Sequence, residues 1–157
     1  MEYIRVSNEN IDKEHICCAI SNNNDIQVSS KKAWLQERFD EGLVFLKSKE
    51  RGKCFIEYIP AENAWIPIVA NSYMYINCLW VAGSFKGHGH STDLLNACIE
   101  DSKSKGKKGL CILSSKKKKP FLADKKFLLK YGFEVVDTVK NEYELLALSF
   151  NGENPYF

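Results

Sequence analysis

The sequence lacks any long apolar run. Nowhere in its 157 residues is there a stretch approaching the ~18 apolar residues that a membrane-spanning helix needs. Residues 1–18 also lack the basic flank and apolar stretch of a secretory signal. Hydrophobic residues make up 45% and charged residues 27%, which excludes disordered and collagen-like chains. We therefore expect a soluble cytoplasmic protein of one domain, residues 1–157, without a membrane partner.

The six cysteines include no CxxC pair, which excludes zinc-ribbon and thioredoxin-type motifs. Most of them lie in apolar segments, as expected for buried, reduced thiols. Two histidines, His88 and His90, are two residues apart in a loop with no third ligand in view, so no metal site is predicted.

Charge is unevenly distributed along the chain. Residues 103–130 hold eleven of the 22 basic residues and one of the 20 acids, a net charge of +10, which leaves −8 for the remainder. This segregation predicts either a polyanionic ligand near the basic segment or a solvated lysine-rich face.

Hydrophobic periodicity predicts a mixed α/β sheet with a β-α-β crossover in the middle. The strand-like segments are 3–6, 43–49, 53–59, 73–81, 109–114, 133–139 and 143–150, and the helical segments are 8–20, 31–40, a stripe through 94–105, and 120–131. The run 73–81 is apolar throughout and is typical of a central strand buried on both faces.

A glycine-rich turn, residues 83–91, joins this central strand to the next helix. Unpaired N–H groups and the dipole at a helix start favour an anionic ligand. Gly87 and Gly89 allow the backbone to approach a phosphate closely.

Two common phosphate-binding patterns do not fit this turn. A nucleotide-triphosphate loop, GxxxxGK(S/T), counted from Gly83, requires glycine where His88 stands. A dinucleotide fingerprint, GxGxxG, counted from Gly87, requires glycine where Thr92 stands.

The run Lys86-Gly87-His88-Gly89-His90-Ser91 resembles the coenzyme A loop of the GNAT acetyltransferases, Gln/Arg-x-x-Gly-x-Gly/Ala, with Lys86 and Ser91 as departures. The segment Lys130-Tyr131-Gly132-Phe133 resembles the family's C-terminal ending. The resemblance extends to the order of elements over the whole chain. The runs INCLWV, FKGHGHS and SSKKKKPFLADKKF are similar to the YoaP-like branch of the family, whose members can carry a further C-terminal domain.

This resemblance implies a GNAT fold, with about seven strands and helices on both faces, and transfer of an acetyl group from acetyl-CoA to an amine. It implies that Leu79, Trp80 and Val81 lie along the pantetheine arm. The pyrophosphate would be held by the residues of the turn and helix start, which are Lys86, Gly87, His88, Gly89, His90, Ser91 and Thr92. Lysines within 103–130 would attract the 3′-phosphate.

The chain departs from the family where the family often places its acid and base. The tyrosine that often protonates the departing thiolate corresponds to Leu128. Tyr131 lies three residues further, about 4.5 Å along a helix, and is a poor substitute. The family's asparagine and glutamate positions hold Phe121 and Lys116.

A thioester is already activated, so positioning of a neutral amine supplies much of the rate. A thiolate with a pKa near 8.5 needs only modest help in leaving. The candidate catalytic residues are Tyr75, Asn77 and Cys78 on the central strand, Glu57 on its expected neighbour, and Ser114 and Ser115 at the end of the next strand.

Two other functions are compatible with the sequence. One is a non-catalytic acyl-CoA-binding sensor, because the usual tyrosine is absent. The other is a nucleic-acid-binding module that uses residues 103–130, although no RNA-binding signature is visible. The acceptor, small molecule or protein, and the oligomeric state are not indicated by the sequence.

Overall fold

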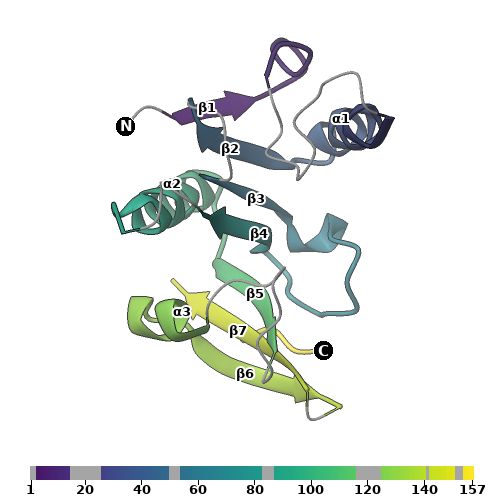
Figure 1. Cartoon of the computed structure of the whole chain (residues 1–157). Coiled ribbons are helices and arrows are strands. Elements are labelled where there is room, and N and C mark those ends of the chain that lie inside the picture. The colour runs from purple at the N-terminus through teal and green to yellow at the C-terminus, as the bar shows by residue number, and fades with distance from the viewer. Residues whose placement is uncertain are drawn as a thin grey trace.

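Seven strands form one sheet in the order β1-β2-β3-β4-β5-β7-β6 (Figure 1). The computed structural model describes residues 3–14, 26–49, 54–82, 87–115, 125–140, 142–150 and 154–157. The strands are β1 Tyr3–Val6, β2 Val44–Ser48, β3 Cys54–Pro60, β4 Tyr73–Val81, β5 Gly109–Ser115, β6 Glu134–Val139 and β7 Tyr143–Ser149. The helices are α1 Ile26–Phe39, α2 His90–Ser104, α3 Lys125–Tyr131 and the short 3-10 helix η1 Ala61–Asn63. The predicted mixed α/β architecture is confirmed.

The sheet is antiparallel except at its centre, where β4 and β5 run parallel. Parallel neighbours need a long crossover connection. Here that connection contains α2, so the predicted β-α-β crossover is confirmed.

Helices cover both faces of the sheet, as predicted (Figure 1). On one face, Leu94 of α2 and Leu128 of α3 pack in a single core cluster with Ile76 of β4. On the other face, Leu35 of α1 packs with Phe45 and Phe55 of the adjacent strands. Alternation along each strand produces the two layers, because successive side chains point to opposite faces.

An extra residue interrupts the pairing of β3 with β4. Glu57 pairs with Cys78, but the next residue, Tyr58, pairs with Ile76, so Asn77 is the additional residue of a β-bulge. As a result, Ile76 and Leu79, three residues apart, both pack beneath α2. A bulge locally increases twist and redirects side chains.

The parallel ladder between β4 and β5 covers only Tyr73–Ile76 against Gly109–Ile112. Beyond it, β5 continues along β7 from Leu113 to Ser115, while β4 continues along β3 to Val81. The two central strands therefore separate immediately before the bulge. We call this point the fork.

Two helix predictions differ from the structure in their bounds. Residues 8–14 form turns and not the start of a helix over 8–20, of which 15–20 lie outside the described residues. The Asn10 side chain accepts a hydrogen bond from the Ser7 N–H at 2.8 Å, and such local side-chain bonds compete with helix formation. The second helix begins at Ile26, earlier than the predicted Lys31. Of the helix predicted over 120–131, residues 120–124 lie outside the described residues and the remainder forms α3.

Gly109 begins β5 where there is no room for a side chain. A Cβ atom there would lie 2.5 Å from the Leu148 carbonyl oxygen and 2.7 Å from Tyr73 Cε2. We expect Gly109→Ala to lower the free energy of unfolding by about 3 kcal/mol, because backbone cannot yield as a flexible side chain does. Urea denaturation measures the loss, and the exposed β6 variant Thr138→Ala should change stability by less than about 0.5 kcal/mol. Equal stabilities of the two variants would contradict this assignment.

Candidate functional site

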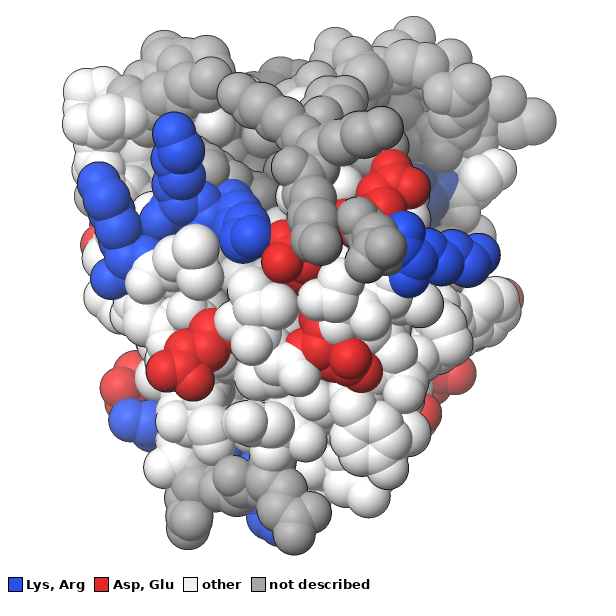
Figure 2. Space-filling view, turned by 90° about the horizontal axis from the view of Figure 1, so that it is seen from below, with Lys and Arg blue, Asp and Glu red and all other residues white. Residues whose placement is uncertain are grey.

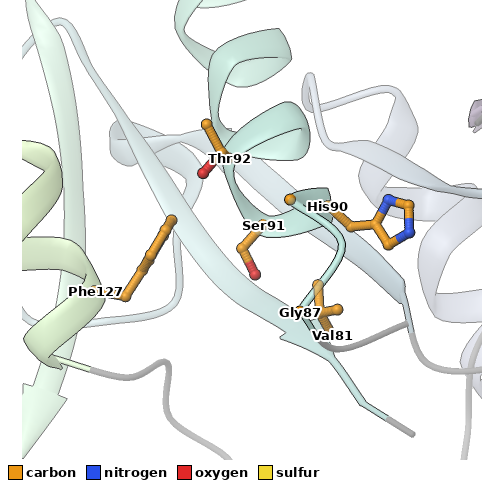
Figure 3. Close-up of a pocket in the computed structure, with 7 residues that line it drawn as sticks. Val81, Gly87, His90, Ser91, Thr92 and Phe127 are labelled. Atoms are coloured by element: carbon orange, nitrogen blue, oxygen red, sulfur yellow. The ribbon is translucent and has the colours of Figure 1, made fainter. Parts of the chain in front are cut away.

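A cavity of about 250 Å³ lies where the end of β4, the start of α2 and the side of α3 meet (Figure 3). Its lining residues are Val81, Gly87, Gly89, His90, Ser91, Thr92 and Phe127. In Figure 3 the Phe127 ring on α3 lies across the cavity from Ser91, and the His90 ring turns away from it.

The start of α2 has the properties of an anion site. Gly87 and Gly89 both have φ of +79°, and a Cβ atom at either position would meet nothing within 4 Å. The first-turn bond runs from the Asp93 N–H to the Gly89 carbonyl at 3.1 Å, so the amides of Ser91 and Thr92 have no acceptor within the helix. Gly89 caps the helix without a side-chain hydrogen bond. These amides and the helix dipole favour a phosphate group.

The structure separates the sequence-predicted coenzyme residues into two groups. Val81 lines the cavity, whereas Leu79 is buried in the core beneath α2 and Trp80 packs on the α1 face. Of the turn, Gly87, His88 and Gly89 are exposed, and Lys86 lies outside the described residues. The core positions of Leu79 and Trp80 leave only their backbone groups for contact with a ligand on the cavity side.

Tyr3 of β1 holds the first turn of α2 in place. Its hydroxyl donates to Asp93 Oδ2 at 3.0 Å, and its oxygen lies 2.9 Å from His90 Nδ1. Burial, and then the hydrogen bond with Asp93, raise the pKa of Tyr3 far above its usual value. The phenol therefore stays protonated and keeps this contact over the physiological pH range.

A second cluster lies on the α1 face beside the bulge. Glu57 is only 4% exposed, and its Oε2 accepts a hydrogen bond from Asn77 Nδ2 at 2.9 Å. Its Oε1 lies 3.0 Å from Lys31 Nζ of α1. The same Lys31 ammonium lies 4.3 Å from the centre of the Trp34 ring. The structure therefore brings together two sequence-predicted candidates, Glu57 and Asn77.

Tyr75 lies on β4 two residues before the bulge residue Asn77, within the last part of the ladder with β5. It is buried, and its phenol oxygen accepts a hydrogen bond from the backbone N–H of Leu113, the first β5 residue beyond the parallel ladder. Burial raises the pKa of Tyr75 well above its usual value. The phenol therefore retains its proton at neutral pH.

The remaining candidates are placed differently. Cys78 is the register partner of Glu57 and packs, half-buried, against the α1-side core. Ser114 and Ser115 lie at the end of β5, where this strand pairs with β7 and no longer with β4. Their register partners are Glu144 and Tyr143. The serines therefore lie on the β5 side of the fork, whereas Glu57 and Asn77 lie on the β3–β4 side.

Neither of the two residues considered for the general acid, Leu128 and Tyr131, has a side chain that lines the cavity. Leu128 is 0% exposed and belongs to the core. The Tyr131 hydroxyl donates a hydrogen bond to Asn96 Oδ1 of α2, and burial raises the pKa of Tyr131. Tyr131 therefore ties α3 to α2. The predicted departures at Lys116 and Phe121 lie outside the described residues.

Two residues were not predicted: Phe127, which lines the cavity, and Tyr3, which contacts the first turn of α2. The only sequence signal for Phe127 is that Tyr131 follows it by four residues, the spacing of one helical turn. In the structure the two ring centres are 5.9 Å apart. Tyr3 carries no local signal, because His90, which it contacts, lies 87 residues away.

Two described lysines of the basic segment 103–130 form ion pairs with acids that lie outside it in the sequence. Lys105 pairs with Asp101 at 2.9 Å, and Lys125 pairs with Glu144 at 2.6 Å. Figure 2 shows Lys and Arg side chains at both sides of a face, most densely at its upper left, with several Asp and Glu side chains nearer its middle. Lys116 to Lys119 lie outside the described residues. Internal pairing of two lysines reduces the charge that this segment offers to nucleic acid.

Neither a membrane crossing nor a metal cluster is found in the described part of the chain. None of its helices has both the length and the apolar character required to cross a bilayer. Among the same residues, no three His, Cys, Asp or Glu side chains are grouped to hold a metal ion.

Comparison with known sequences identifies relatives over the whole chain. The profile of the acetyltransferase (GNAT) family matches residues 9–133. The chain is 47% identical over 160 residues to an uncharacterised N-acetyltransferase, YoaP, of Bacillus subtilis (strain 168), and this alignment covers 100% of the chain. The chain spans 64% of the length of that relative.

Solved structures share the fold at low sequence identity. Aminoglycoside 6′-acetyltransferase type Ii superposes with a TM-score of 0.67 at 13% identity, covering 98% of this chain and 100% of the other. YncA of Salmonella typhimurium, a putative acetyltransferase solved with acetyl-CoA, gives 0.63 at 14% identity, covering 98% and 96%. PaiA N-acetyltransferase of Thermoplasma acidophilum, in complex with coenzyme A, gives 0.61 at 14% identity, covering 96% and 100%. At these identities the likeness shows the fold alone.

Proposed function

Since this chain belongs to the GNAT acetyltransferase family, we propose that it transfers an acetyl group from acetyl-CoA to an amine while both are bound. The observation that carries the proposal is the cavity at the start of α2, which Val81 lines at the end of β4. The 47% identical relative, named an N-acetyltransferase, supports the same activity.

The cavity fits the diphosphate of coenzyme A. Gly87 and Gly89 leave open space where any other residue would place a Cβ, and the Ser91 and Thr92 amides point their dipoles at that space. Val81 and Phe127 supply apolar contacts at its rim. When bound, acetyl-CoA supplies an activated thioester.

The acceptor side of the proposed site is the Glu57 cluster. An amine attacks only as the free base, so a carboxylate that takes its proton accelerates transfer. Glu57 is the proposed base, and the hydrogen bond from Asn77 orients its carboxylate toward the bulge. The Tyr75 phenol holds its proton too tightly to release it to a thiolate with a pKa near 8.5, so its proposed role is hydrogen-bond donation at the fork.

Acetyl-CoA is expected to stabilise the folded protein. A ligand at 100 times its Kd adds about 2.7 kcal/mol to the free energy of unfolding, which raises Tm by several degrees. Thermal denaturation with and without the coenzyme measures this shift. An unchanged Tm at millimolar acetyl-CoA contradicts the proposed function.

One observation favours a second candidate, a non-catalytic acyl-CoA sensor. Leu128, where the family resemblance places a tyrosine, is completely buried. Release of free thiol from acetyl-CoA in the presence of an amine panel separates the two. A Tm shift without thiol release assigns the sensor, and thiol release assigns the transferase.

We further propose that the chain forms one domain in the cytoplasm. The single seven-stranded sheet supports one domain. The free thiols of Cys54, Cys98 and Cys111 suit a reducing compartment. Burial, followed by the Asp93 charge, raises the pKa of Cys54 to about 11, which keeps that thiol protonated and unreactive.

A further inference from the structure

The Lys31 ammonium group lies between the Glu57 carboxylate and the Trp34 ring. Its Nζ lies 3.0 Å from the nearly buried Glu57 carboxylate and 4.3 Å from the centre of the Trp34 ring. A carboxylate and an aromatic face together form a recognition site for an alkylammonium ion. The Lys31 side chain is still 33% exposed, so part of it is open to solvent.

This ammonium is separated from the fork by a single carboxylate. Glu57 binds Lys31 through Oε1 and Asn77 through Oε2. Asn77 is the extra residue of the bulge, directly after the last β4 residue that pairs with β5. An amine held here lies on the α1 face beside the fork, and our inference places the thioester of bound acetyl-CoA at this fork.

We propose that Lys31 is itself an acetylation site, modified by the acetyl-CoA bound to its own chain. This inference rests on the proposed function. The Lys31 ammonium gives one proton to Glu57, which passes it to solvent. The nitrogen lone pair forms the amide bond with the acetyl carbon, the carbon–sulfur bond breaks, and the second proton lost from nitrogen ends on the coenzyme A thiol.

Tethering gives Lys31 an advantage over lysines that meet acetyl-CoA only by collision. Groups held in position react at effective concentrations far above those in solution. Acetylation removes the charge of Lys31 and ends its ion pair with Glu57. The modified chain then presents the Glu57 carboxylate, still bound to Asn77, without a resident cation.

Lys125 is a matched internal control. Its side chain is also 33% exposed, and it also pairs with a buried carboxylate, Glu144, at 2.6 Å. The full chain is incubated with acetyl-CoA, digested, and mapped by peptide mass spectrometry over time. We expect Lys31 to be acetylated about tenfold faster than Lys125 or more, at a rate that does not change on dilution of the protein.

The Gly89→Val variant, designed to weaken coenzyme binding, should bring acetylation of Lys31 down to the rate of Lys125. Equal acetylation of the two lysines in the unsubstituted protein overturns the inference. So does a rate for Lys31 that falls on dilution, which indicates transfer between copies, or a rate unchanged in Gly89→Val, which indicates solution chemistry. Because the Tm shift with acetyl-CoA is measured separately, these failures leave the proposed function standing, and absence of the shift removes both.

Discussion

Replacing Glu57 by glutamine is expected to slow acetyl transfer by about 10²–10⁴-fold, the usual contribution of a positioned general base. Glutamine keeps the size of the side chain and an oxygen for the Asn77 amide, but it cannot take a proton from the acceptor amine. The measurement is thiol release with the amine that gives the fastest turnover in the panel. The Tm shift with acetyl-CoA should remain, because Glu57 does not line the cavity at the start of α2.

Glu144→Gln is the matched control for this experiment. Glu144 is similarly buried, at 6% exposure against 4% for Glu57, and also binds a lysine. It lies on β7, opposite Ser114. Both variants lose an ion pair of comparable burial, so similar losses of stability are expected, but only Glu57→Gln should lower kcat. Equal effects of both variants on kcat would show that Glu57 has only a structural role.

Gly89→Val is expected to weaken acetyl-CoA binding by about tenfold or more, corresponding to at least about 1.4 kcal/mol. At φ of +79° a β-branched residue strains the backbone, and its side chain projects into the open space beside the turn. The displaced or reoriented amides at the start of α2 then lose their contacts with the diphosphate. Isothermal titration calorimetry with coenzyme A measures the change.

Gly106→Val separates backbone strain from loss of the site. Gly106 has φ of +73° and is likewise open on the Cβ side, but it follows the C-terminus of α2. Each substitution should cost about 1–2 kcal/mol of stability from the left-handed backbone. Unchanged coenzyme affinity in Gly106→Val is the expected result. Unchanged affinity in Gly89→Val would refute the assignment of the turn.

The elements of the sheet were predictable because their signals are local. The apolar run from Tyr73 to Val81 gave β4 with its observed bounds, and Gly106 and Gly132, both at positive φ, follow the ends of α2 and α3. The helix predicted over 8–20 was wrong for residues 8–14, because asparagine side chains offer the backbone alternative partners there. The turn that opens α2 was found from its two glycines, and both line the cavity.

The sequence by itself determined the layered sheet and the glycine turn that opens α2, since period, apolar runs and glycine positions act over a few residues at a time. Only the tertiary structure decided the arrangement around the fork. Nothing in the run YMYINCLWV marks Asn77 as a bulge, and nothing local joins it to Glu57, which lies 20 residues earlier. The partners of Glu57, Asn77 and Lys31 are set by strand register and by the docking of α1 on the sheet, and these depend on how the whole core packs.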